Sequence, residues 1–223
     1  MNKKSIIVLT VLSIFGYSHC ISAANITITS SPSNVKDAYV DSNAPATNFE
    51  TSALKIINYP SNYEVRSLIQ FTLPGILNGQ TIDLATLYLY KSNDGGGITG
   101  DLVTAKRVTS PWDESSVTWA TQPTFDSVYE NTQPIDDGYL GQIVFDITDL
   151  VASWVDGSSA NYGTILVHEP VASAEKNFYS SESGIGTPFL YIEYSANPVP
   201  EPFTIFLLLS SVFGLFLRGI KKQ

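Results

Sequence analysis

Cysteine and histidine are almost missing from this chain of 223 residues. The one cysteine, Cys20, lies in an N-terminal segment that we expect to be removed, which excludes disulfides and thiol chemistry from the mature protein. One histidine, His168, then remains, and its place after the apolar run 165–167 is typical of a structural residue. Nucleophilic catalysis therefore has few residues to use, and a pair of carboxylates is the enzymatic alternative that stays open.

Basic residues are also scarce. The chain has 12 Lys and Arg against 21 Asp and Glu, and the terminal segments 1–24 and 197–223 hold five of the basic residues but only one acidic residue. Residues 25–196 therefore carry 7 basic and 20 acidic side chains, a net charge near −13. This charge argues against nucleic acid and against an anionic membrane surface as partners. It is compatible with neutral glycans as ligands, or with a requirement for bound divalent cations.

The first 24 residues have the parts of a secretory signal peptide in the usual order. Lys3 and Lys4 form a basic start, residues 6–15 form an apolar core, and small residues at 22–24 precede a cleavage site. We therefore predict that residues 1–24 direct export and are then removed.

The end of the chain also has three parts in order. Val199, Pro200, Glu201 and Pro202 come first, an uncharged block over residues 203–217 follows, and Arg218, Lys221 and Lys222 come last. As a helix at about 1.5 Å per residue, the block would cover roughly 22 Å, less than a hydrocarbon core of ~30 Å. We predict a marginal transmembrane helix within residues 203–223, with its basic end on the cytoplasmic side.

This tail resembles the PEP-CTERM sorting signal. The resemblance implies an exported precursor that the inner membrane holds until an exosortase-type protease cuts near Pro200-Glu201-Pro202. Such proteins belong to Gram-negative bacteria that make exopolysaccharide. An ordinary tail anchor behind a Pro-rich linker at residues 197–202 is the alternative.

Between these ends, residues 25–196 contain short segments with alternating polarity. In residues 65–73 and 82–90, apolar side chains recur at every second position, which places one face of each strand on a core. About ten such strands with turn residues between them predict an all-β sandwich. One short helix is expected over residues 149–155 with Thr148 as its N-cap, and residues 122–139 are expected to form a long loop.

Several landmarks follow one another along this domain. They are Asp37-Ala38-Tyr39-Val40, Asn48, Arg66-Ser67-Leu68-Ile69-Gln70-Phe71, Trp112 to Trp119, Asp146 to Val151, Trp154, Asn161-Tyr162-Gly163 and Ser180-Ser181-Glu182. The set resembles the DNRLRE domain, also classed as family 96 of the carbohydrate-binding modules. The resemblance implies a jelly-roll β-sandwich used as a non-catalytic module on exported bacterial proteins. Some relatives are linked to acidic polysaccharides such as alginate through Lys and Arg, whereas this domain has only 7 basic residues.

Aromatic side chains on an outer face are suited to sugars, because they stack on the apolar sides of sugar rings. Tyr88 and Tyr90 lie opposite the apolar face of their strand, so they are candidates for glycan binding, with Arg66 on a strand expected beside them. The alternative is that both tyrosines only cover the sandwich and that Arg66 pairs with Glu64 or an Asp. The three tryptophans are expected in the core.

Four residues carry side-chain oxygens of the kind that Ca²⁺ prefers: Asp37, Asp41, Asn43 and Glu182. They are the candidate ligands of a Ca²⁺ site. No EF-hand or repeat spacing accompanies them, and the alternative is that they serve as turn residues.

These features predict an exported, non-catalytic protein of the cell surface or extracellular matrix that binds exopolysaccharide. Its precursor would be anchored in the inner membrane and processed at both ends. A polysaccharide-degrading enzyme and a structural surface subunit without a ligand are the alternatives.

Overall fold

The computed structural model describes residues 23–31, 33–94, 101–169 and 175–196. The linker and sorting box at residues 197–202 and the expected transmembrane helix with Arg218, Lys221 and Lys222 lie outside these ranges, as do residues 1–22. The signal peptide and the membrane anchor therefore stay predictions. Among the described residues, no helix has the length and apolar character to cross a membrane.

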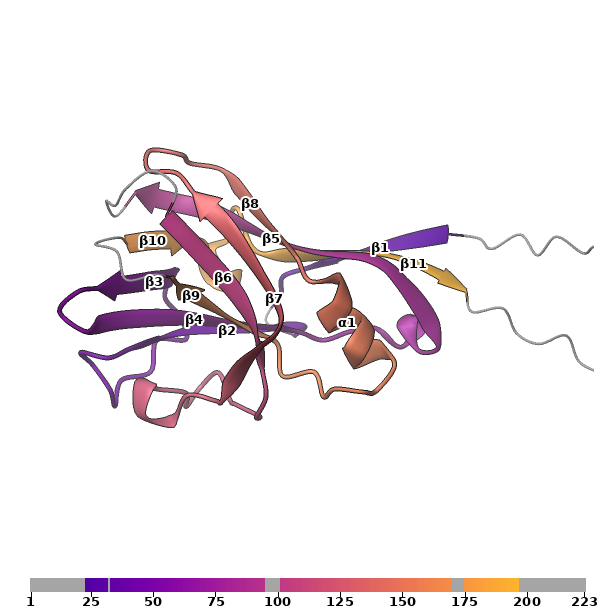
Figure 1. Ribbon diagram of the computed structural model, residues 1–223, viewed down its shortest axis with the longest axis horizontal. Coiled ribbons are helices and arrows are strands. Elements are labelled where there is room, and N and C mark those ends of the chain that lie inside the picture. The colour runs from indigo at the N-terminus through magenta and orange to yellow at the C-terminus, as the bar shows by residue number, and fades with distance from the viewer. Residues whose placement is uncertain (1–22, 32, 95–100, 170–174, 197–223) are drawn as a thin grey trace, which may run out of the picture. The chain divides into compact units, whose positions relative to one another are not determined.

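The regular structure of these ranges is mainly β-strand (Figure 1). The strands are β1 (Ala23–Thr29), β2 (Val35–Asp41), β3 (Leu54–Tyr59), β4 (Tyr63–Phe71), β5 (Gln80–Asp94), β6 (Asp101–Val108), β7 (Phe125–Ile135), β8 (Gln142–Asp146), β9 (Thr164–His168), β10 (Glu175–Phe178) and β11 (Phe189–Ala196). The helix is α1 (Thr148–Val155), and short 3-10 turns lie at Gly75–Leu77, Trp119–Thr121 and Ser181–Ser183.

The strands form two antiparallel sheets, which the pairing of β5 with β10 joins into one continuous system of 11 strands. In the first sheet the order is β1, β11, β5, β8, and in the second it is β10, β3, β4, β9, β6, β7, with β2 also paired to β4. The long strand β5 belongs to the first sheet along most of its length and pairs with β10 near its end. Consecutive strands β4 and β5 therefore lie in different sheets.

The core lies between the two sheets, and the predicted alternation is confirmed. Ile69 and Phe71 of β4 and Leu87 and Leu89 of β5 are buried in one apolar cluster. Helix α1 adds Leu150 to the same cluster. An all-β sandwich with one short helix is thus confirmed, and the jelly-roll assignment stays a prediction.

The expectation of a long loop at residues 122–139 is wrong. Strand β7 occupies Phe125–Ile135 and pairs with β6 from Asp101 to Val108. Its polar residues and Pro134 are typical of a loop, so the sequence did not indicate a strand here. β7 is the last strand of the second sheet, and an edge strand tolerates both, because one of its sides needs no hydrogen-bonding partner.

The expected N-cap of the helix is also wrong. Thr148 is the first helical residue, and Asp146 Oδ1 accepts hydrogen bonds from its backbone N (3.0 Å) and its Oγ1 (2.6 Å). The Thr148 hydroxyl in turn accepts a hydrogen bond from the backbone N of Ala85 at 2.9 Å. The side chain expected to cap α1 therefore ties the helix to β5.

A second apolar cluster covers the outer face of the second sheet. The connection between β6 and β7 places Trp112 and Val117 against Leu68 and Ile165. Trp112 is 8% exposed, and its Nε1 donates to the backbone oxygen of Tyr162 at 2.9 Å. The placement of Trp112 in a core is confirmed, and the other two tryptophans pack half-buried against the core clusters.

The two ends of the described domain meet in the first sheet. β11 lies between β1 and β5, and Ala23 is paired with Ser195 at the outer end of the β1–β11 ladder (Figure 1). β1 begins at Ala23, two residues before the expected start of the domain at Asn25.

Candidate functional site

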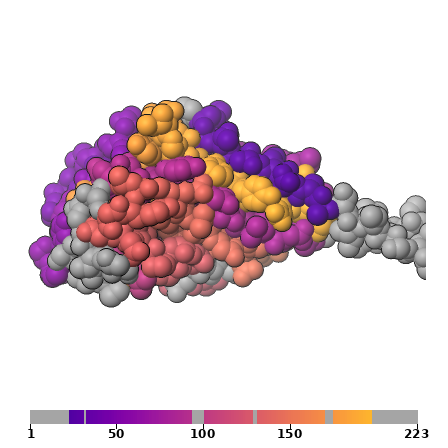
Figure 2. Space-filling model, turned by 90° about the horizontal axis from the view of Figure 1, so that it is seen from above, coloured from indigo at the N-terminus to yellow at the C-terminus, as the bar shows by residue number. Residues whose placement is uncertain are grey.

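The outer face of the first sheet carries a row of aromatic and apolar side chains. Strand pairing sets Phe189 of β11, Tyr88 of β5 and Val144 of β8 side by side. The rings of Tyr88 and Phe189 are stacked, with centroids 4.3 Å apart and planes 7° apart. Val144 is 41% exposed. Figure 2 shows this side of the molecule, with β1 (indigo) and β11 (yellow) next to each other.

Polar groups border this row on both sides. Tyr90 lies opposite Gln142, whose Nε2 donates to the tyrosine hydroxyl at 3.1 Å. On the other side, Tyr191, Thr86 and Asp146 form the next row. We call the five side chains Tyr88, Tyr90, Val144, Phe189 and Tyr191 the aromatic face. The predicted position of Tyr88 and Tyr90 on an outer face is confirmed, and their role in glycan binding stays a prediction.

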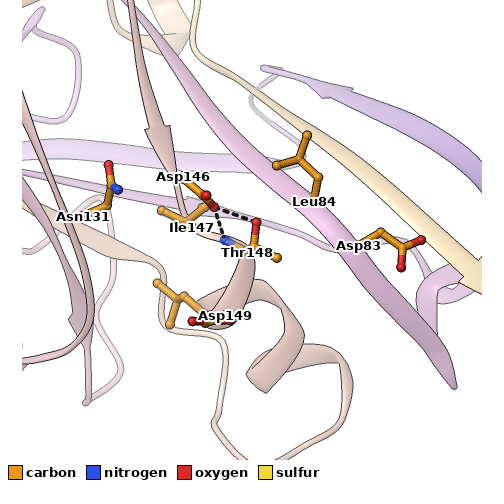
Figure 3. Close-up of a pocket in the computed structure, with 8 residues that line it drawn as sticks. Asp83, Leu84, Asn131, Asp146, Ile147, Thr148 and Asp149 are labelled. Carbon is orange, nitrogen blue, oxygen red and sulfur yellow. Dashed lines mark hydrogen bonds between the residues drawn. The ribbon is translucent and has the colours of Figure 1, made fainter.

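An open pocket of about 400 Å³ lies next to the aromatic face, at the start of α1 (Figure 3). The polar residues that line it include Asp83, Asp146, Asp149 and Asn131. Asp146 belongs both to this pocket and to the polar row beside Tyr191. The pocket therefore offers hydrogen-bond acceptors for hydroxyl groups at the border of an aromatic surface, and its charge disfavours acidic ligands.

Arg66 does not join the tyrosines, because β4 is in the second sheet. Its Nε and Nη2 donate to the two carboxylate oxygens of Glu64 at 2.7 and 2.8 Å. Its Nη1 donates to Gln122 Oε1 at 3.0 Å, and the guanidinium lies over Trp119 at 4.7 Å and Phe125 at 5.1 Å. The alternative, in which Arg66 pairs with Glu64, is confirmed, and the placement of Arg66 beside Tyr88 and Tyr90 is wrong.

The four expected Ca²⁺ ligands fall into two separate places. Asp41 Oδ1 accepts from the backbone N of Asn43 at 2.8 Å, as in a turn, and Asp41 Oδ2 accepts from Tyr63 at 3.2 Å. Asp37 lies four residues earlier on the same strand, roughly 13 Å away at the usual rise per residue. Asp37 instead meets Glu182, so the predicted set of four does not form one site.

A third carboxylate, Glu114, completes the cluster of Asp37 and Glu182. One oxygen from each of the three side chains lies within 4.8 Å of the others. Burial raises the pKa of Asp37 to about 8, the charges of Glu182 and Glu114 add to the rise, and a hydrogen bond from Ser181 opposes it. Burial also raises the pKa of Glu114. Sequence reasoning missed Glu114 because the chain brings it to Asp37 from 77 residues away.

A separate group of charged side chains is buried between β6, β9 and β10. Lys176 Nζ lies 3.1 Å from Asp101 Oδ2, and His168 Nε2 lies 3.8 Å from Asp101 Oδ1. The three side chains are 0% exposed. A substrate in solution cannot reach His168 in this position, which agrees with the structural role expected for it.

Comparison with known proteins supports the resemblance seen in the sequence. A search of curated proteins finds no match for the chain. A family model for carbohydrate-binding module family 96 matches residues 28–194, which include β2 to β10, most of β11, the aromatic face and the carboxylate cluster. Since this match covers more than half of the chain, the chain belongs to carbohydrate-binding module family 96.

Proposed function

We propose that the protein is an exported, non-catalytic protein of the cell surface or extracellular matrix that binds exopolysaccharide through the aromatic face. The stacked pair of Tyr88 and Phe189 beside the exposed Val144 carries this proposal. The two rings cover one face of each other, so this surface offers ring edges and the apolar Val144 to the C–H groups of a sugar, and the polar rows beside it suit the hydroxyl groups. Membership of a carbohydrate-binding family supports the same function.

The charge of the domain favours a neutral glycan. Residues 25–196 contain 7 basic side chains against 20 acidic ones. Two of the basic ones, Arg66 and Arg107, are held in close ion pairs with Glu64 and Asp126. An acidic polysaccharide would therefore meet repulsion near the carboxylates of the pocket, unless cations lay between the two.

Replacing Tyr88 by alanine should weaken glycan binding by on the order of 10-fold, because it removes one ring of the stack and leaves the other without its neighbour. The measurement is affinity electrophoresis through gels that contain a soluble neutral polysaccharide, such as a β-glucan or a mannan, or the exopolysaccharide of the host. Tyr59→Ala is the matched control, since Tyr59 is a half-buried tyrosine of the second sheet. Its affinity should equal that of the wild type.

The same experiment separates the alternative functions. Equal affinity of Tyr88→Ala and the wild type would remove the aromatic face as the site. Retardation by alginate alone would overturn the preference for a neutral glycan. Shortening of the polymer, detected by size-exclusion chromatography, would favour an enzyme that uses the carboxylates of the pocket. No retardation in any gel would favour a structural subunit without a ligand.

We also propose that the protein reaches the surface by a PEP-CTERM type of sorting. The order of Val199, Pro200, Glu201 and Pro202, the apolar block and the basic end supports this route. The inner membrane would hold the precursor, and an exosortase-type protease would release it.

Sorting predicts two new chain ends. Mass spectrometry of the protein recovered from the surface of a Gram-negative host should find an N-terminus at Asn25 and a C-terminus near Pro200-Glu201-Pro202. Replacing Glu201 by alanine should leave uncut precursor in the inner membrane. Recovery of wild-type protein that keeps residues 203–223 would contradict the cleavage and favour an ordinary tail anchor.

A further inference from the structure

The carboxylate cluster lies apart from the aromatic face and has no part in the proposed glycan binding. Its members come from three distant segments: Asp37 from β2, Glu114 from the connection between β6 and β7, and Glu182 from the 3-10 turn Ser181–Ser183. We propose that Asp37, Glu114 and Glu182 bind one Ca²⁺ ion, which fastens these three segments together.

The distances fit such an ion. The three ligand oxygens lie within 4.8 Å of one another. Ca²⁺ binds oxygens at about 2.3–2.6 Å, so two oxygens on one ion are at most about 5 Å apart. The smaller Mg²⁺, with ligands at about 2.0–2.1 Å, requires a tighter octahedral arrangement. A set made only of carboxylates, without His or Cys, also disfavours zinc.

The burial of Asp37 is a second, independent observation. Its side chain is 0% exposed. Asp37 Oδ2 accepts a hydrogen bond from the backbone N of Ser181 at 2.8 Å, whereas Oδ1 has no hydrogen-bond partner among the described residues. A buried carboxylate oxygen without a donor is costly, and a coordinated cation would remove that cost.

The surroundings hold the carboxylates in place, and the charge of Lys36 offsets only part of that of Glu114. In the described part of the chain, no lysine, arginine or histidine forms an ion pair with Asp37, Glu114 or Glu182. Glu114 Oε1 accepts from the backbone N of Asp37 at 2.7 Å, and Glu182 Oε1 accepts from Ser181 Oγ at 2.6 Å. Up to three negative charges thus converge at a point where a divalent cation would balance two.

An ion can reach the proposed ligands from the solvent, because the cluster is exposed on one side. Asp37 is buried, Glu114 is half-buried and Glu182 is exposed. Water can therefore reach the outer side of the cluster and supply the remaining ligands, because Ca²⁺ takes about 6–8 oxygens. The segment of Glu114 is also anchored by Asn48, whose Nδ2 donates to the backbone oxygens of Glu114 at 2.7 Å and Val117 at 2.8 Å. Binding would therefore fasten segments that are already close to their final positions.

The test uses the full chain, purified in mild detergent and freed of metal with EDTA. Isothermal titration with CaCl₂ should show one Ca²⁺ ion per chain, and 1 mM Ca²⁺ should raise the midpoint of thermal unfolding by several degrees. Asp37→Asn should weaken Ca²⁺ binding at least about 10-fold, because it removes the most deeply buried charge. Glu182→Gln should also weaken binding, and because it changes an exposed side chain to one of the same shape, the variant should still fold.

Asp41→Asn is the matched control, since Asp41 ends the same strand but lies outside the cluster; its Ca²⁺ affinity should equal that of the wild type. Asp37→Asn should fold in EDTA at least as well as the wild type, because an amide at this buried position never carries a charge that a cation would have to balance. The proposal is overturned if the wild type shows neither binding heat nor a thermal shift. It is equally overturned if Asp37→Asn and Glu182→Gln respond to Ca²⁺ as the wild type does.

Discussion

Replacing Gly163 by alanine is expected to destabilise the domain by about 3–5 kcal/mol. Gly163 has φ +81°, a conformation that costs free energy for any residue with a Cβ. An added Cβ would also lie within 2.2 Å of the backbone oxygen of Ile69 and 2.8 Å of the Cα of Gln70. Because both contacts are to β4 itself, no side-chain rotation relieves them. Equilibrium unfolding in urea measures the loss.

Gly157→Ala is the matched control for this variant. Gly157 has nearly the same φ, +79°, and an added Cβ would have nothing within 4 Å. Its replacement should cost only about 1–2 kcal/mol, the strain of the left-handed conformation. The difference between the two variants then measures the close approach of residues 161–163 to β4. Equal losses for the two variants would show that this contact is looser than described.

Replacing Lys176 by methionine is expected to destabilise the domain by about 3–5 kcal/mol. Methionine keeps much of the aliphatic volume but removes the ammonium group that lies 3.1 Å from Asp101 Oδ2. Asp101 is 3% exposed, so its charge would remain in the interior without this cation. Thermal and urea unfolding of the variant measure the effect.

Two controls separate the buried charge from the loss of packing. The double variant Lys176→Met/Asp101→Asn should recover more than half of the lost stability, because no buried charge is left uncompensated. Lys55→Met breaks a pair with Glu175 whose side chains are 31% and 24% exposed, so it should cost less than about 1 kcal/mol. If the double variant is no more stable than Lys176→Met, the ion pair is not the source of the loss.

The strands that pack on the core could be predicted from the sequence, because apolar and polar side chains alternate along them. Residues 65–73 and 82–90 alternate between apolar and polar side chains, and β4 and β5 bury the expected faces. The edge strand β7 escaped prediction, since its polar residues and Pro134 resemble a loop when the neighbouring strand β6 is unknown. Local pattern therefore identified central strands better than edge strands.

From the sequence, the candidate sites could be predicted only for residues that lie on the same strand. Tyr88 and Tyr90 were correctly placed on an outer face, because alternation fixes the side of a strand. Phe189 and Val144, which stand beside Tyr88, come from strands that pairing over more than 50 residues brings together. Arg66 lies elsewhere for the same reason: β4 and β5, although adjacent in the sequence, pair within different sheets.

The metal ligands show a related limit. Asp37 and Asp41 are close in the sequence, but an extended strand separates them, whereas Glu114 and Glu182 reach Asp37 through the fold. The composition of the chain indicated carboxylate ligands for a cation, but only the tertiary structure shows which carboxylates lie together.

Strand β11 is placed to carry mechanical load. It runs between β1 and β5 and pairs with both over residues 189–195. A pull on the chain at Ala196 would act along the length of the strand, so both ladders of hydrogen bonds would be sheared together and not peeled apart one at a time. Tension that enters the domain at its C-terminal end would thus be shared across three strands, on the sheet whose outer side carries Tyr88 and Phe189.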